Sequence, residues 1–427
     1  MSQLLANRCF WGILLVAFAL RIGAAIWWQN RLGEEERFFF GDSLSYEVLA
    51  RQIAHGEEYR YGDSAIFRTP GYPVLLAPFY WFSDHPNPLL LRSLGAFLGT
   101  FSVALCGLLA ARLFSPQAGL YAAGITTFYP GGLAMSAFVL SEVAFCPWML
   151  LQLWFWSEAY QAPRRQSSLA WGVAAGLAMA AAVLTRPSWM LFPFFAVPIC
   201  LLAVSHRRRQ LEVFLALGLT FMAAMSPWWI RNYQIAGKFV PTSLQVGASL
   251  YDGIRPGADG GSDMSFVEPF RAEQLAADAA NDAPPPGTFE TRLDDRIKAA
   301  SIAWVKAHPD EVLALAGRKL LRYWNFWPNE ASFQSVPFRL IIAAGYLPIL
   351  TLGLAGLLIY RQQSAGIWLC GLPIFYFSLL HSIFVSSIRY RQPAMLPLAI
   401  LAAGAAVWLL QRMKKKKNCA VDQPAAA

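Results

Sequence analysis

The stretch LLLRSLGAFLGTFSVALCGLLAARL, residues Leu89–Leu113, decides the fold class of this chain. It is long enough to cross a bilayer, because a transmembrane helix needs about 20 mostly apolar residues. The whole chain shares this character, since 56% of its 427 residues are hydrophobic and 14% are charged. In soluble proteins about a quarter of the residues are charged. We therefore expect an all-α polytopic membrane protein.

The same criterion, applied to both sides of this stretch, predicts a bundle of about ten transmembrane helices. The predicted spans are Phe10–Trp28, Leu89–Leu113, Leu120–Val139, Val143–Trp156, Leu169–Leu184, Trp189–Val204, Leu211–Ile230, Leu340–Tyr360, Ile367–Phe384 and Ala394–Leu410. The first span follows Arg8 and lacks a small-residue cleavage site, so we expect an uncleaved signal anchor rather than a removed signal peptide.

Basic residues gather in alternate short loops, which is typical of the cytoplasmic face of a membrane protein. They are Arg112, Arg164, Arg165, Arg207–Arg209, Arg361 and the run Arg412–Lys417. We therefore expect an inner (plasma) membrane protein with both termini in the cytoplasm and with the lipid bilayer as a partner. Because these clusters account for much of the net charge of +9, we expect no binding to nucleic acid.

This topology divides the chain into four parts. They are an N-terminal transmembrane bundle (1–230) that includes the first outer loop (29–88), an extracytoplasmic segment (231–337), C-terminal transmembrane helices (338–412) and a basic, disordered cytoplasmic tail (413–427). The extracytoplasmic segment is loop-rich in its first half. From Thr291 to Tyr323 it has helical periodicity, which is interrupted at His308-Pro309.

The first outer loop holds a polar stretch, FFFGDSLSYEVLARQIAHGEEYRYGDSAIFRTPGYP, at Phe38–Pro73. Its residues Ser43–His55 are expected to form a short helix along the membrane interface, with Asp42 or Ser43 as the N-cap. The proline and glycine residues at 68–73 then predict an irregular turn. From the residues alone, Asp42 is either only the cap of this helix or a catalytic carboxylate.

The predicted outer face gathers acidic and basic residues that could form one site. They are the carboxylates Asp42 and Glu142 and the arginines Arg68, Arg186, Arg231 and Arg389. This combination suits the transfer of a group off a phosphate, because a carboxylate can deprotonate the acceptor while planar guanidinium groups stabilise the leaving phosphate. A structural interpretation stays open for each: a helix cap for Glu142, and interface anchors for the arginines.

Several other chemistries lack their motifs. The sequence contains no P-loop, no GxGxxG and no GxSxG, and its five histidines follow no metal-binding spacing. The six cysteines have no CxxC spacing, which predicts neither a disulfide framework nor a zinc site. The donor of a transferred group should therefore be a molecule that the membrane itself supplies.

Taken together, these motifs resemble the GT-C glycosyltransferases related to protein O-mannosyltransferases and to the lipid A aminoarabinose transferase. The matching motifs are GDSLSYEVLA and FRTPGYPVLLAPFY in the first outer loop, LSE at Leu140–Glu142, LTRP at Leu184–Pro187, PWWIRNYQIAGKFVPTS at Pro227–Ser243 and RYRQPAMLP at Arg389–Pro397. The resemblance covers nearly the whole chain. It implies a GT-C-like bundle and an inverting glycosyltransferase that moves a sugar from a polyprenyl-phosphate donor to an acceptor outside the cytoplasm.

The resemblance also implies roles for individual residues. Asp42 would be the catalytic base, and Glu142 would help to shape the acceptor or sugar site. The implied substrate-binding residues are Arg68, Tyr72, Arg186, Arg231 and Arg389. Many relatives carry a second acid next to the first-loop carboxylate, but here that position is Ser43, so we expect no metal cofactor. The acceptor could be a glycolipid, a polymer or a protein.

Two other functional classes are compatible with a polytopic chain. The first is a lipid or glycolipid transporter, and the second is a non-catalytic membrane assembly subunit. A transporter should have charged residues along a path across the bilayer. Here Arg21 is the clearest charge inside a predicted span, and the polar residues gather on one side of the membrane, which favours chemistry at that surface.

Overall fold

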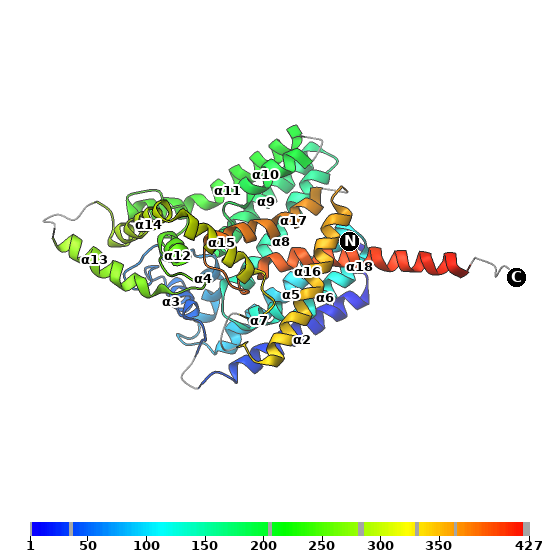
Figure 1. The fold of residues 1–427 in the computed structure, drawn as a ribbon, viewed down its shortest axis with the longest axis horizontal. Helices are drawn as coiled ribbons and strands as arrows, with labels where there is room; N and C mark the ends of the chain where they lie inside the picture. The colour runs from blue at the N-terminus through cyan, green and yellow to red at the C-terminus, as the bar shows by residue number, and fades with distance from the viewer. Residues whose placement is uncertain are drawn as a thin grey trace.

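The computed structural model of this protein describes residues 2–33, 37–203, 207–280, 286–328, 333–362 and 365–421 (Figure 1). Within these ranges the regular structure is helical, and no β-strand forms apart from an isolated bridge between Tyr61 and Ser64. The predicted all-α polytopic membrane fold is therefore confirmed.

Seven helices in the described part of the chain are long and apolar enough to cross a membrane, against about ten that we predicted. They are α2 (Arg8–Gln29), α5 (Pro88–Leu113), α9 (Arg165–Thr185), α11 (Arg207–Ala236), α16 (Val336–Tyr360), α17 (Ala365–Ile383) and α18 (Gln392–Val421). The last helix continues through the lysine run to Val421, where we had expected disorder from residue 413 onward.

The other predicted spans take a different form. They correspond to α6 (Pro116–Phe128), α7 (Pro130–Ala137), α8 (Ser141–Gln161), the 3₁₀ turn η2 (Pro187–Trp189) and α10 (Phe192–Ala203). The predicted span 120–139 is divided because Pro130 has no backbone N–H to continue α6. Helix α10, with 12 residues, is shorter than the roughly 20 residues that a span requires.

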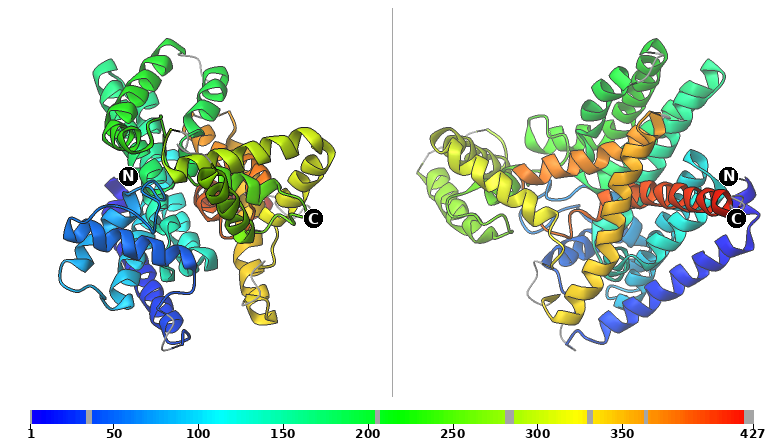
Figure 2. Two further views of the ribbon diagram at one scale, coloured as in Figure 1. Left: turned by 90° about the vertical axis from the view of Figure 1, so that its left-hand side faces the viewer. Right: turned by 45° about the vertical axis from the view of Figure 1, so that its right-hand side comes forward.

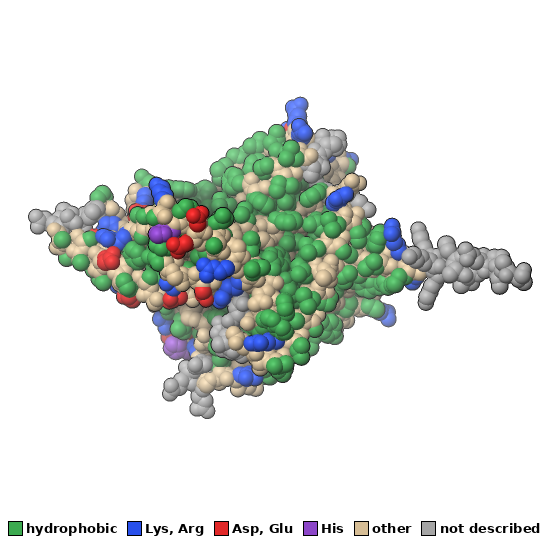
Figure 3. All heavy atoms as spheres, viewed as in Figure 1, with side chains coloured by type: hydrophobic (Ala, Val, Ile, Leu, Met, Phe, Trp, Pro, Cys, Tyr) green, Lys and Arg blue, Asp and Glu red, His purple; other side chains and the backbone are tan. Residues whose placement is uncertain are grey.

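Close helix packing in the bundle depends on small residues. Gly176 of α9 faces α11 so closely that a Cβ atom built there would lie 2.5 Å from the carbonyl oxygen of Leu217. Such close approach of backbones is the usual means of helix association where lipid gives no hydrophobic driving force. The exterior of the bundle in Figure 3 is mostly hydrophobic, whereas charged side chains gather over the helices of the outer segment.

The outer segment is more helical than we predicted. It contains α12 (Val246–Ile254), η3 (Met264–Phe266), α13 (Val267–Ala279), α14 (Phe289–Ala307) and α15 (Pro309–Tyr323). Two of these helices, α12 and α13, lie in the half that we expected to be loop-rich. The predicted break at His308-Pro309 is confirmed, because α14 ends at Ala307 and α15 begins at Pro309.

Helices α12–α15 lie at one end of the molecule, and both chain termini lie towards the other (Figures 1 and 2). Between this outer end and the bundle lies the first outer loop, which forms α3 (Gly41–His55), α4 (Gly71–Leu76) and the 3₁₀ turn η1 (Ala77–Tyr80). The predicted helix at 43–55 is thus confirmed. Its buried residues Tyr46 and Ala50 pack against Tyr72 and Leu76 of α4, which fixes the loop as a folded unit.

Candidate active site

A glycine holds the first outer loop against the end of α9. A Cβ atom on Gly71, the first residue of α4, would lie 2.6 Å from backbone atoms of Leu184 and Thr185. Glycine is required where two backbones approach so closely. This contact brings Arg68, which precedes α4, towards Arg186, which follows α9, and both arginines line the same cavity.

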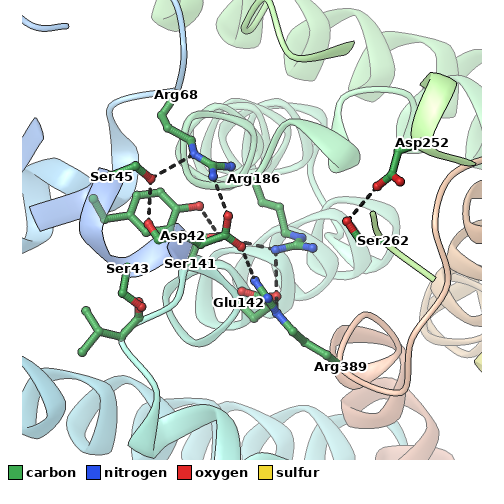
Figure 4. Close-up of polar contacts among 12 residues, drawn as sticks. Asp42, Ser43, Ser45, Arg68, Ser141, Glu142, Arg186, Asp252, Ser262 and Arg389 are labelled. Carbon is green, nitrogen blue, oxygen red and sulfur yellow. Dashed lines mark hydrogen bonds and ion pairs between the residues drawn. The ribbon is translucent and has the colours of Figure 1, made fainter. Parts of the chain in front are cut away.

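Asp42 lies in the first turn of α3 and faces two arginines from distant parts of the chain (Figure 4). Arg68 donates from Nη2 to Oδ1 at 2.6 Å, and Arg389 donates from Nη2 to Oδ2 at 2.9 Å. Our prediction that Asp42 or Ser43 caps this helix is wrong. The helix begins at Gly41, so its N-cap is Phe40, which makes no side-chain capping bond.

Glu142 lies in the first turn of α8 and shares Arg389 with Asp42. Its Oε1 atom accepts a hydrogen bond from Nε of Arg389 at 2.6 Å and lies 3.2 Å from Nη1 of Arg186. Only 1% of the Glu142 side chain is exposed. Arg389 therefore joins the two predicted carboxylates, and Glu142 fixes the orientation of both arginines.

The arginines control the protonation of Asp42. Burial alone would raise the pKa of this carboxyl, but the neighbouring charges of Arg68 and Arg389, with their hydrogen bonds, lower it to about 2. Asp42 is thus ionised at neutral pH. It is also a weak proton acceptor for as long as both guanidinium groups remain on it.

Three residues that we did not predict complete this polar cluster. Ser45 accepts a hydrogen bond from Nε of Arg68 at 3.3 Å. Tyr46 donates to Oγ of Ser141 at 3.1 Å, and Ser141 also accepts from Arg186 at 3.4 Å. Helical spacing could have predicted Ser45 and Tyr46, because residues three and four positions after Asp42 lie on the same face of α3.

A cavity of about 1600 Å³ opens beside the cluster. Asp42, Arg68, Arg186 and Arg389 line it, whereas Glu142 does not. One part of the wall is apolar and comprises Met135, Phe138, Phe333, Ile342 and Leu380. Another part is polar, belongs to the outer segment and comprises Arg255, Asp263, Glu268, Arg271 and Asp294. The cavity thus offers separate surroundings for an apolar chain and for a hydrophilic group.

Two predicted substrate-binding residues do not line this cavity. Tyr72 is 1% exposed, and its ring packs edge-on against Tyr46. Arg231 donates from Nη2 to the carbonyl oxygens of Tyr59 and Ala65 at 2.8 and 3.0 Å. Arg231 therefore connects α11 to the first outer loop, and Tyr72 packs against α3 outside the cavity.

The carboxylates of this site are paired with arginines rather than grouped as ligands for a divalent cation. Hard cations take several oxygen ligands, but Asp42 and Glu142 are both engaged by guanidinium groups. Ser43, which follows Asp42, donates to the carbonyl oxygen of Val139 at 2.8 Å. Throughout the described ranges, no three His, Cys, Asp or Glu side chains form a group that could hold a metal ion.

A family model for dolichyl-phosphate-mannose-protein mannosyltransferase matches residues 75–239. This is less than half of the chain. The matched region includes Glu142, Arg186 and Arg231, but Asp42, Arg68 and Arg389 lie outside it. A comparison with curated proteins finds no match.

Solved structures of the archaeal oligosaccharyltransferase AglB from Archaeoglobus fulgidus match almost the entire chain. The complex with an inhibitory peptide and a dolichol-phosphate has a TM-score of 0.59 at 14% identity, over 97% of this chain and 52% of AglB. The apo form has a TM-score of 0.57 at 15% identity, over 96% and 52%. This chain has the GT-C fold.

The chain spans about half the length of the AglB chains that it matches. A further match, to ArnT from Cupriavidus metallidurans bound to undecaprenyl phosphate, has 15% identity and a TM-score of 0.45, over 98% of this chain and 82% of ArnT. The resemblance expected from the motifs is thus confirmed by a family model and by the fold.

Proposed function

We propose that this chain is an inverting membrane glycosyltransferase that moves a sugar from a polyprenyl-phosphate donor to a glycolipid, polymer or protein. The proposal depends on one observation: Asp42 and three arginines meet at the wall of one large cavity, and a second carboxylate, Glu142, is paired with two of these arginines. Two of the comparisons support a lipid-phosphate donor. The matching family model names dolichyl-phosphate mannose, and AglB was solved with a dolichol-phosphate.

The arginines are suited to the phosphate of such a donor. Three guanidinium groups, of Arg68, Arg186 and Arg389, face two carboxylates, which leaves one positive charge for an anionic ligand. Planar guanidinium groups bind phosphate oxygens through paired hydrogen bonds. In this proposal Tyr72 and Arg231 support the site from behind and do not touch the phosphate.

Phosphate binding would also activate Asp42. Both oxygens of its carboxylate accept bonds from arginines in the free protein. A phosphate group would compete for Arg68 and Arg389, and each bond that Asp42 loses raises its pKa towards the ordinary range of a carboxyl. The donor would thereby turn a weak proton acceptor into a usable general base.

The transfer then balances as a single displacement. Asp42 takes the proton of the acceptor hydroxyl while that oxygen forms a bond to the anomeric carbon of the sugar. The bond between this carbon and the phosphate oxygen breaks, and its electron pair leaves with the lipid phosphate, where the arginines stabilise it. Attack from the side opposite the phosphate gives inversion. None of these steps uses a metal ion.

The position of the cavity gives the expected side of the membrane. Residues of helices α12–α15 and of α17 line it, and helices α12–α15 lie at the end of the molecule away from the termini (Figure 1). Because the basic loops predict cytoplasmic termini in the inner membrane, the site would face the extracytoplasmic side. The apolar wall at Phe138, Phe333 and Ile342 would then accept the polyprenyl chain.

The test is sugar-dependent release of lipid phosphate. Purified protein is incubated with a panel of polyprenyl-phosphate sugars and with membrane extract as the acceptor. We expect release with at least one donor, and the Asp42→Asn protein should lose about 100-fold or more of this activity, which is the usual range for a general base.

The matched control is Asp278→Asn. Asp278 is also a carboxylate paired with an arginine, Arg292 at 2.8 Å, but it lies on α13 and does not line the cavity. This control should retain the wild-type rate. Full transfer by Asp42→Asn would exclude Asp42 as the base. A wild-type protein that is inert with every donor, yet moves labelled lipid across proteoliposomes, would instead support the transporter.

A further inference from the structure

A histidine that no motif predicted lies in the wall of the same cavity. His381 belongs to the last turn of α17 and is 6% exposed. Its ring is parallel to that of Tyr390, with centroids 5.0 Å apart and planes 1° apart, and it stacks on Tyr323 at 5.4 Å. The imidazole is therefore packed among aromatic rings that are nearly parallel to it.

The hydrogen bond of the ring fixes its tautomer. The Nδ1 atom of His381 lies 2.8 Å from the carbonyl oxygen of Val385. A carbonyl only accepts, so Nδ1 carries the hydrogen. No carboxylate pairs with His381 in the described chain, and a charged ring without such a partner is costly among aromatic side chains. In the uncharged ring, Nε2 then holds a lone pair.

Among the described residues the only hydrogen bond of the His381 ring is that of Nδ1, so Nε2 is left for a ligand in the cavity that the side chain lines. The polar cluster is near, because the guanidinium of Arg186 lies over the ring of Tyr390, the stacking partner of His381, at 5.4 Å from its centroid. The arginines of this cluster donate hydrogen bonds only. His381 thus adds a fixed, neutral acceptor near guanidinium groups that suit an anion.

We propose that Nε2 of His381 accepts a hydrogen bond from a hydroxyl group of the sugar substrate. A neutral acceptor repels the oxygens of a phosphate and needs a donor, and hydroxyl groups are the donors that a sugar offers. The hydroxyl belongs either to the donor sugar or to the acceptor. This inference rests on the proposed glycosyl transfer and assigns His381 to substrate recognition rather than to proton transfer.

The competing interpretation is purely structural, since the bond to Val385 could be the only role of the ring. Two substitutions separate the interpretations. Asn in place of His381 keeps an N–H near the Nδ1 position, so it can still donate to Val385, but it has no atom at the Nε2 position. Gln in place of His381 extends an amide oxygen towards the Nε2 position and loses the bond to Val385.

The experiment measures lipid-phosphate release from polyprenyl-phosphate mannose, glucose and galactose by wild type, His381→Asn and His381→Gln. We expect kcat/KM to fall about tenfold in His381→Asn and less than threefold in His381→Gln, because tenfold corresponds to about 1.4 kcal/mol, which is within the range of a single hydrogen bond. Release with water alone as acceptor reports on the donor sugar. Release with membrane extract reports on the acceptor.

Monodeoxy donors supply the second measurement. If the hydroxyl belongs to the donor sugar, the wild-type protein should turn over one monodeoxy donor about tenfold more slowly than the donor with all its hydroxyl groups. The His381→Asn protein should turn over these two donors at the same rate. If the hydroxyl belongs to the acceptor, His381→Asn should raise only the KM for acceptor.

Two outcomes would overturn the inference while leaving the glycosyl transfer in place. One is wild-type kinetics in His381→Asn. The other is a greater loss in His381→Gln than in His381→Asn, together with a lower melting temperature, which is the result that a structural bond to Val385 predicts. A wild-type protein that is inert towards all three donors and the wider panel would overturn the proposed function itself.

Discussion

Nη2 of Arg389 lies 2.9 Å from Oδ2 of Asp42, although 347 positions separate the two residues in the sequence. The same guanidinium donates through Nε to Oε1 of Glu142 at 2.6 Å. Arg389 therefore connects three parts of the chain: the first outer loop, the start of α8 and the segment between α17 and α18. The spacing of its donors, rather than its charge alone, makes this connection.

Replacement of Arg389 by lysine tests that geometry. An ammonium group keeps the charge but cannot donate to both carboxylates from the positions of Nε and Nη2. Hydrogen bonds to charged groups are worth about 1.5–3 kcal/mol, so we expect kcat/KM for donor turnover to fall about 10- to 100-fold. Arg412→Lys is the control, because this arginine lies over Trp408 near the far end of α18. A wild-type rate for Arg389→Lys would show that charge alone is sufficient.

The fold class could be predicted from the long hydrophobic runs. A segment that crosses the bilayer must satisfy its backbone hydrogen bonds internally, and a single long run does so as an α-helix. The helix in the first outer loop was predictable for a similar reason, since its periodicity is local. Its N-cap was not, because the helix starts two residues before Ser43 and draws Asp42 into its first turn.

The partners of the site residues could not be predicted from the sequence. In the sequence, Arg231 and Arg389 both lie near the ends of predicted transmembrane spans. In the structure, Arg231 binds backbone carbonyls of the first outer loop, whereas Arg389 binds two carboxylates. The difference arises from tertiary packing, which no local pattern encodes. His381 was missed for the same reason, because its stacking partners Tyr323 and Tyr390 come from two other segments.

Glu142 should be important for stability as well as for activity. Its buried carboxylate lies between Arg186 and Arg389, so Glu142→Ala leaves two guanidinium groups without a shared counter-charge. Removal of one partner from a buried ion pair costs about 3–5 kcal/mol. We expect a decrease of this size in the free energy of unfolding, measured by denaturant titration in detergent. Glu142→Gln should lose less, because its amide oxygen still accepts a hydrogen bond, and equal losses would contradict this explanation.

The pKa of Asp42 predicts an asymmetric pH profile. Its pKa is lowered to about 2 in the free protein, below the ordinary value of about 3.9. The stabilisation from its ion pairs is therefore present above about pH 4 and is lost as the pH falls towards 2. If donor phosphate displaces the arginines, the pKa of Asp42 is higher in the substrate complex.

The profiles of kcat/KM and kcat separate these two states, because the first reports on the free enzyme and the second on the complex. We expect the acidic limb of kcat to lie at a higher pH than any limb of kcat/KM that belongs to Asp42. Coincident acidic limbs would mean that the donor leaves the arginines on Asp42.

Metal removal gives a simple fourth test. Since Asp42 and Glu142 are engaged by arginines and Ser43 donates to a backbone carbonyl, we expect excess EDTA to leave the rate of lipid-phosphate release unchanged. Activity that is lost with EDTA and restored by one divalent cation would contradict this expectation. Such a result would require the carboxylates to exchange their arginines for the metal ion.

The outer segment holds the chain that carries Arg389. Two side chains of α15 bind residues 383–386. Lys319 donates from Nζ to the carbonyl oxygen of Ile383 at 2.5 Å, and Arg322 donates from Nε to the carbonyl oxygen of Ser386 at 3.0 Å. Ser386 also donates from its backbone N–H to the carbonyl oxygen of Gly260 and from Oγ to that of Lys319, both at 2.8 Å. Helix α15 and the loop at Gly260 thus fix the backbone three positions before the arginine.

Lys319→Met tests whether this support reaches the active site. Lys319 does not line the cavity and is 1% exposed, and methionine keeps most of its length without a donor for Ile383. The loss of one hydrogen bond, about 1 kcal/mol, should lower kcat about three- to tenfold by displacing Arg389. The KM for the donor should change less, because Arg68 and Arg186 still hold the phosphate. Lys238→Met, which removes an exposed pair with Asp295, should have no effect. If Lys319→Met lowers stability while kcat stays at the wild-type value, the outer segment does not position Arg389.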